Sequence, residues 1–111
     1  MLQVDERCYT GMMTPNGAII HFFDGESLEP VATERAYACP LGWSYGAERV
    51  NSALSVLADY LERTESLRSP RSLAEAFATQ FLSQLGREQV LFIEEHRIQD
   101  WLRVMDMLGE A

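Results

Sequence analysis

The strongest constraint on the fold is the spacing of apolar residues in the middle of the chain. From Ala47 onward, apolar side chains recur at intervals of three and four residues, which places them on one side of an α-helix. They are Val50, Ala53, Leu54, Leu57 and Leu61. The preceding segment, Gly-Trp-Ser-Tyr-Gly, contains Trp43 and Tyr45. The pattern predicts a core-facing helix over 47–61, with this segment as its approach and Trp43 in the core.

The segment before this helix has the features of strands and turns. Two apolar runs rich in β-forming residues, 7–13 and 17–25, flank a Thr-Pro-Asn turn, as is typical of a β-hairpin. The next segment, 26–40, contains prolines and shows no regular apolar spacing. We therefore expect a hairpin followed by a loop that crosses the surface.

A second helix is predicted after residue 68. It begins either at Pro70, with Ser69 before it, or at Ser72, which has the capping-box partner Glu75 three residues later. We expect Gly86 to end it in a left-handed turn. Its apolar row is Leu73, Phe77, Phe81 and Leu85.

The last part of the chain predicts a short buried strand over 89–93 and a third helix over 98–108, with Gly109 as its stop. The order β-β-α-α-β-α favours an α+β fold, in which the N-terminal hairpin and the C-terminal strand form a small antiparallel sheet against about three helices. Residues 1–111 are expected to form a single domain. The predicted shared core is Trp43, Leu54, Leu57, Phe77, Phe81, Phe92, Ile98 and Trp101.

The charge of the chain restricts its partners. The chain has seventeen acidic residues and nine basic ones, all of them arginine, which gives a formal net charge of -8. Direct nucleic-acid binding is disfavoured because it depends on neutralised phosphates, whereas a basic protein surface is a suitable partner. The competing interpretation is that the excess of negative charge only keeps the protein soluble.

Two further features bear on the location of the protein. No apolar run approaches the roughly 18 to 20 residues that would span a bilayer, and Asp5 and Glu6 stand where a signal peptide would be basic. We therefore expect a cytoplasmic protein, either monomeric or homodimeric, that does not bind membranes.

No motif predicts catalysis, a metal or a cofactor. The soft-ligand candidates Cys8, His21, Cys39 and His96 lack the two-to-four-residue pairing of zinc sites. The run Glu-Glu-His at 94–96 has aspartate at 100 where a zincin helix would have its second histidine, and without lysine there is no Walker loop. Two free thiols and a non-enzymatic protein are the expectation.

The acidic segment 24–35 is the candidate partner-binding site. It places Asp24, Glu26, Glu29 and Glu34 on a predicted loop, where binding residues are often found. A merely solvated charged loop is the competing interpretation. In that case the next candidate is the side of the first helix expected to be exposed, with Glu48, Arg49, Asn51 and Asp59.

From about residue 7 to 102, the sequence resembles an uncharacterised domain family of bacterial, plasmid and phage proteins. Its members have a hairpin, a loop, a Phe-x-Trp-Gly-Tyr-Gly-Gly-Ser-Gly-Pro motif before a Gln-Leu-Ala-x-Ala-Ile-Leu-x-Asp helix, and a final Leu-Thr-Glu-x-x-Ile-x-x-Trp-Leu helix. Trp43, Tyr45 and Gly46 match the loop motif, and segments 53–61 and 92–102 match the helices. The glycine-rich part is shortened here, and Glu48 would repel an anion at the helix N-terminus.

Together, the small size, the charge and the resemblance favour a non-enzymatic interaction protein. The most concrete hypothesis is a phage or mobile-element inhibitor of a host defence complex, similar to anti-CRISPR proteins, that occupies a basic nucleic-acid-binding surface. The alternative is an accessory or regulatory bacterial domain that binds a small molecule or a peptide.

Overall fold

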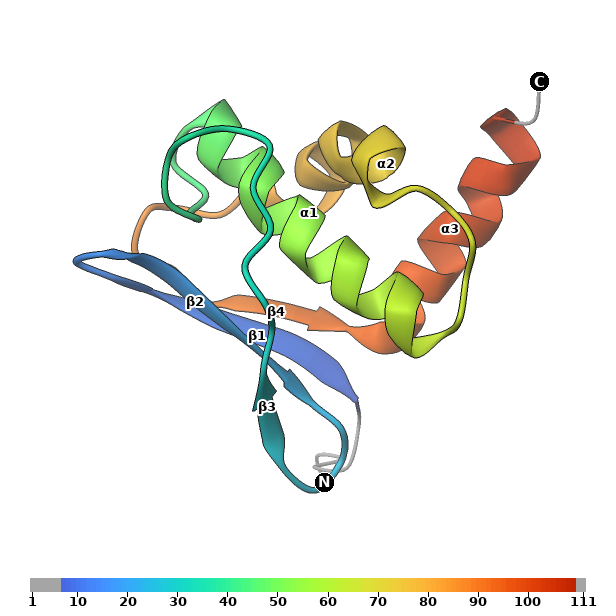
Figure 1. Ribbon diagram of the computed structural model, residues 1–111, viewed down its shortest axis with the longest axis horizontal. Helices are drawn as coiled ribbons and strands as arrows, with labels where there is room; N and C mark the ends of the chain where they lie inside the picture. Colours follow the sequence, from blue (N-terminus) through green and yellow to red (C-terminus); the bar gives the residue numbers. More distant parts are fainter. Residues whose placement is uncertain (1–6, 110–111) are drawn as a thin grey trace.

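The computed structural model describes residues 7–109 and contains a four-stranded antiparallel sheet with helices on one of its faces (Figure 1). The strands are β1 (Cys8–Thr14), β2 (Gly17–Phe23), β3 (Leu28–Pro30) and β4 (Leu91–Glu94), in the order β3-β2-β1-β4. The helices are α1 (Gly46–Arg63), α2 (Pro70–Phe77) and α3 (Glu95–Gly109), and a π-helical turn, η1 (Ala78–Leu82), continues α2. The predicted α+β class is confirmed.

The predicted hairpin is β1 and β2, which pair from Cys8 opposite Phe23 to Thr14 opposite Gly17. Gly17 has a φ of 114°, a conformation that a side chain would strain. The Thr14 hydroxyl donates a 2.6 Å hydrogen bond to the Gly17 carbonyl oxygen and accepts one from the Asn16 amide. The predicted C-terminal strand is β4, which pairs with the other side of β1.

The expectation of a continuous loop over 26–40 is wrong at β3. Leu28 and Glu29 pair with Phe23 and Phe22 of β2, and Pro30 lies opposite His21. An edge strand needs hydrogen bonds on one side only, so the proline at its end is tolerated. Beyond β3 the chain has no regular secondary structure until α1.

This irregular loop is held by a row of buried polar side chains on α1. The Asn51 amide accepts hydrogen bonds from the backbone N–H groups of Ala36 and Tyr37 and donates to the carbonyl oxygens of Tyr37 and Cys39. Ser52 and Ser55 bond the backbone of residues 42 and 34 in the same way. The expected exposure of Asn51 is therefore wrong, because its side of the helix faces the loop.

The second helix begins at Pro70, the first of the two predicted starts, with Ser69 at the N-cap. The Ser72 hydroxyl donates to the Ser69 carbonyl oxygen, so Ser72 does not act as a cap. The predicted left-handed stop at Gly86 is wrong, because the π-helical turn ends at Leu82 and the φ of Gly86 is not positive.

The predicted core is largely confirmed. Trp43, Phe77 and Ile98 are fully buried, and Phe81 and Trp101 pack half-buried against the same cluster. The prediction that Phe92 lies in the core is wrong, because its side chain is 55% exposed. Helices cover only one face of the sheet, and alternate residues of β4 point away from them. Cys8 and Cys39 form no disulfide, as expected.

Candidate functional site: an acidic edge beside an uncovered sheet face

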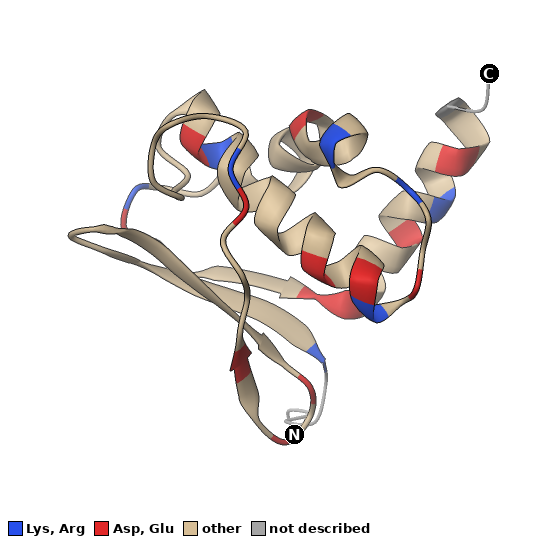
Figure 2. Cartoon of the chain, in the orientation of Figure 1, with Lys and Arg blue, Asp and Glu red and all other residues tan. Residues whose placement is uncertain are grey.

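The acidic segment follows one edge of the molecule. It begins in the turn between β2 and β3, continues along the edge strand β3 and ends where the loop passes α1 (Figure 2). Glu29 lies in β3 itself. The four predicted residues are thus spread along an edge, and the local structure gives them different roles.

Asp24 holds the turn between β2 and β3. Its carboxylate accepts hydrogen bonds from the backbone amides of Ser27 and Glu26, at 3.0 and 2.8 Å. These bonds lower the pKa of Asp24 below its ordinary value. Asp24 therefore supplies a fixed negative charge, while the exposed carboxylate of Glu26 has no ion pair within residues 7–109.

Glu29 belongs to a network that joins the sheet to α1. It forms a 2.8 Å ion pair with Arg63, which also bonds Asp59 and lies over the ring of Phe22. Asp59 in turn accepts a 2.6 Å hydrogen bond from the hydroxyl of Tyr9, whose pKa is raised by burial and by this carboxylate. The charge of Glu29 is therefore partly neutralised by Arg63 and is less available to a partner.

Glu34 lies further along the edge, where its backbone amide donates to the Ser55 hydroxyl. Its side chain is exposed, and neither it nor the adjacent Arg35 has an ion pair in the described part of the chain. Of the four predicted residues, Glu26 and Glu34 thus offer carboxylates without an internal partner.

The sequence prediction did not identify the apolar face of the sheet that lies opposite the helices. The strand register places Met12 opposite Ile19, Thr10 opposite Phe92, and Phe23 opposite Leu28 on this face. Four of its large side chains, Met12, Ile19, Leu28 and Phe92, are each between 49% and 57% exposed. Alternation of the side chains within the strands was the available signal.

The apolar face and the acidic edge are continuous. Leu28 belongs to β3 and directly follows the turn that carries Asp24 and Glu26. An apolar centre with a polar, charged rim is the usual composition of a protein-binding surface. We refer to Met12, Ile19, Leu28 and Phe92 as the outer sheet face, and to the 24–34 segment as the acidic edge.

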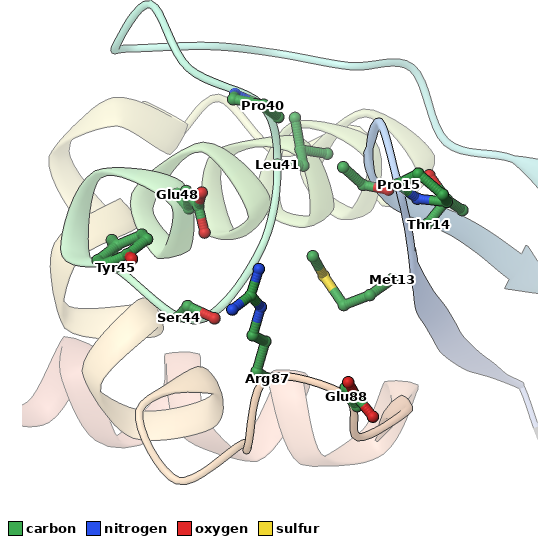
Figure 3. Close-up of a pocket in the computed structure, with 11 residues that line it drawn as sticks. Met13, Thr14, Pro15, Pro40, Leu41, Ser44, Tyr45, Glu48, Arg87 and Glu88 are labelled. Carbon is green, nitrogen blue, oxygen red and sulfur yellow. Dashed lines mark hydrogen bonds between the residues drawn. The ribbon is translucent and has the colours of Figure 1, made fainter.

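The approach to α1 is a structural element, as predicted, and it also borders a cavity. The Trp43 indole donates to the Gln89 carbonyl oxygen at 3.2 Å, and Arg49 donates to the carbonyl oxygens of Trp43 and Ser44. Beside them lies a cavity of about 490 Å³, into which Arg87 points between Ser44 and Met13 (Figure 3). The Ser44 hydroxyl oxygen is buried there without a hydrogen-bond partner.

Two further observations on residues 7–109 concern metals and membranes. Within residues 7–109, no three histidine, cysteine, aspartate or glutamate side chains lie close enough together to hold a metal ion. None of the helices in that range has both the length and the apolar character that crossing a membrane requires.

Comparison with known proteins gives one match. No curated protein and no solved structure matches this chain. Residues 9–104, which include all of the sheet except Cys8, together with α1, α2 and most of α3, match a domain family described as a family of unknown function (DUF6166). The resemblance to an uncharacterised small domain is thereby confirmed, and the chain belongs to this family.

Proposed function

We propose that this protein is a small acidic binding domain that docks on a basic, partly apolar surface of another protein through its outer sheet face and acidic edge. The observation that carries the proposal is the continuity of the two features at Leu28. The apolar side chains would supply buried area, and the carboxylates would orient the partner and accelerate association.

The distribution of ion pairs supports a basic partner. Within residues 7–109, five of the nine arginines form ion pairs with carboxylates, at positions 7, 63, 68, 97 and 103. At the acidic edge, Glu29 is paired with Arg63, but the exposed carboxylates of Glu26 and Glu34 have no ion pair within residues 7–109. A complementary positive surface would relieve this excess.

The most specific form of the proposal is an inhibitor from a phage or mobile element that covers the nucleic-acid-binding surface of a host defence complex, as anti-CRISPR proteins do. Its small size and its charge of -8 support this form. The phage and plasmid origin that the sequence resemblance implies would also favour it. In this form it has no catalytic step, no cofactor and no direct contact with nucleic acid.

The test is a kinetic measurement on partners captured from host extract with the tagged protein. Glu26→Gln with Glu34→Gln removes two exposed charges that have no role in the fold. This variant should associate with a captured basic protein about threefold to tenfold more slowly at low salt, and its association rate should depend less on salt. Biolayer interferometry at two ionic strengths measures both quantities.

The matched control is Glu75→Gln with Glu88→Gln, which removes the same charge from exposed positions away from the acidic edge. If only long-range attraction by the net charge mattered, the two double variants would have equal association rates. This result would refute the acidic edge as the docking site. Ile19→Ser should accelerate dissociation instead, because it removes apolar contact from the outer sheet face.

The cavity beside α1 favours a second candidate, a regulatory domain that binds a small molecule. Its wall combines Arg87 and the Ser44 hydroxyl with the carboxylates of Glu48 and Glu88, so a ligand carrying both charges would suit it better than a simple anion. A compound that stabilises the parent protein but not Arg87→Ala in a thermal shift would favour this function over the first.

A further inference from the structure

Helix α3 presents a second exposed apolar surface, separate from the outer sheet face. Its buried side carries Ile98 and Leu102, but Val104, Met107 and Leu108 are 49%, 78% and 78% exposed. The C-terminal half of α3 extends away from the sheet, beyond the other helices (Figure 1). Within a single chain these side chains are therefore only partly covered.

A groove continues this surface onto η1. Phe81 and Trp101, both half-buried, meet edge to face with ring centroids 5.9 Å apart, and the Arg97 guanidinium lies over the Phe81 ring. Together with Val104 they border a groove of about 380 Å³. Partly covered tryptophan, phenylalanine and arginine side chains of this kind contribute most to binding at protein interfaces.

The charges around this surface are balanced, unlike those of the chain as a whole. Arg97 pairs with Glu94, and Arg103 pairs with Asp100. These two arginines and two carboxylates therefore cancel, although the chain carries a net charge of -8. Two copies can approach here without like-charge repulsion, whereas a strongly basic partner gains nothing.

We propose that the occupant of this surface is a second copy of the chain. The α3 helices would pack antiparallel around a two-fold axis, with the row of Trp101, Val104 and Leu108 of each copy against that of the other. Such an isologous contact uses the same patch twice and leaves no apolar row uncovered. The proposal does not depend on the outer sheet face, which stays open in the dimer.

The contact is small. From Trp101 to Leu108 the helix advances by only about 10 Å, and a standard stable interface engages about 20 to 30 residues on each side. We therefore expect a dimer that forms reversibly and dissociates on dilution.

Sedimentation velocity of the full chain over a wide concentration range tests the proposal. The parent should shift from monomer to dimer as concentration rises, and Val104→Glu with Met107→Glu should raise the dissociation constant at least about tenfold. Both positions are exposed, so circular dichroism should show an unchanged fold. A parent that stays monomeric at every concentration would overturn the proposal.

The control is Ile19→Glu, which places a charge on the outer sheet face and should leave the dimer intact. Loss of the dimer in this variant, with the α3 variant unaffected, would assign self-association to the sheet and refute α3. Tryptophan emission gives an independent readout, because Trp43 is already fully buried and only Trp101 can change its environment. A blue shift that follows the dimer population is expected in the parent, and its absence would contradict the contact.

Discussion

At the scale of single residues, the loop between β3 and α1 depends on the amide of Asn51. That side chain is fully buried and reaches four backbone groups of residues 36–39, at 2.8 to 3.0 Å. A carboxamide is suited to this position because it accepts through its oxygen and donates through its nitrogen without carrying a charge. It replaces the hydrogen bonds that a strand or helix would have provided.

We predict that Asn51→Ala lowers the free energy of unfolding by about 2 to 4 kcal/mol, since it leaves several backbone groups without partners. Urea denaturation measures the change. Gln99→Ala is the matched control, because it also removes an amide from a helix, at an exposed position of α3. Equal stability of the two variants would show that water satisfies the loop as well as Asn51 does.

The prediction missed the role of Asn51 for a physical reason. Apolar spacing marks the side of α1 that faces the core, and polar residues next to that stripe are assigned to solvent by default. Here a loop without regular structure covers that side. Its backbone groups have no partners in a strand or helix, so they require polar side chains. Only the position of the loop, which local spacing does not contain, distinguishes the two environments.

At the scale of elements, β4 shows how layer structure decides burial. Its apolar run suggests a strand buried on both faces, as in parallel sheets. In the structure Leu91 and Ile93 are buried and Phe92 is about half exposed, because the helices cover one face only. The strand and the packing of helices on one face of the sheet followed from the sequence, but the side of the sheet on which Phe92 lies did not.

The register of β4 predicts unequal costs for two adjacent truncations. Ile93→Ala should destabilise the protein by about 2 to 5 kcal/mol, because it empties a packed core position opposite Tyr9. Phe92→Ala should cost less than about 1 kcal/mol, although phenylalanine is the larger side chain, since it faces away from the helices. Thermal denaturation of both variants checks this order, and the reverse order would disprove the assigned register.

At the scale of the whole molecule, the α+β class and all but one of the elements followed from sequence, because each helix carries an apolar stripe and each longer strand an apolar run. The third strand did not, since three residues are too few for a pattern and Pro30 argued against it. The acidic segment was recognised as a group, but Glu29 is committed to Arg63 and Asp24 to a turn. Such contacts join distant segments and leave no local signal.

The excess of negative charge should also cost stability, most of all at the end of α1. Glu62 lies in its last turn and Glu65 just beyond it, where the helix macrodipole disfavours negative charge. Both side chains are exposed and form no ion pair in the described residues. Elsewhere, exposed ion pairs offset little of the repulsion, because each contributes only about 0 to 1 kcal/mol.

We therefore predict that Glu62→Gln with Glu65→Gln stabilises the protein by about 1 kcal/mol at low ionic strength. The gain should shrink as salt is added, because the Debye length falls from about 30 Å at 0.01 M to about 8 Å at 0.15 M. The parent itself should melt at a higher temperature in the higher salt, since screening weakens repulsion more than it weakens the few ion pairs. Calorimetry of both proteins at the two salt concentrations measures these effects. A parent that melts lower in salt would show that its ion pairs, and not its excess charge, dominate the electrostatics of the fold.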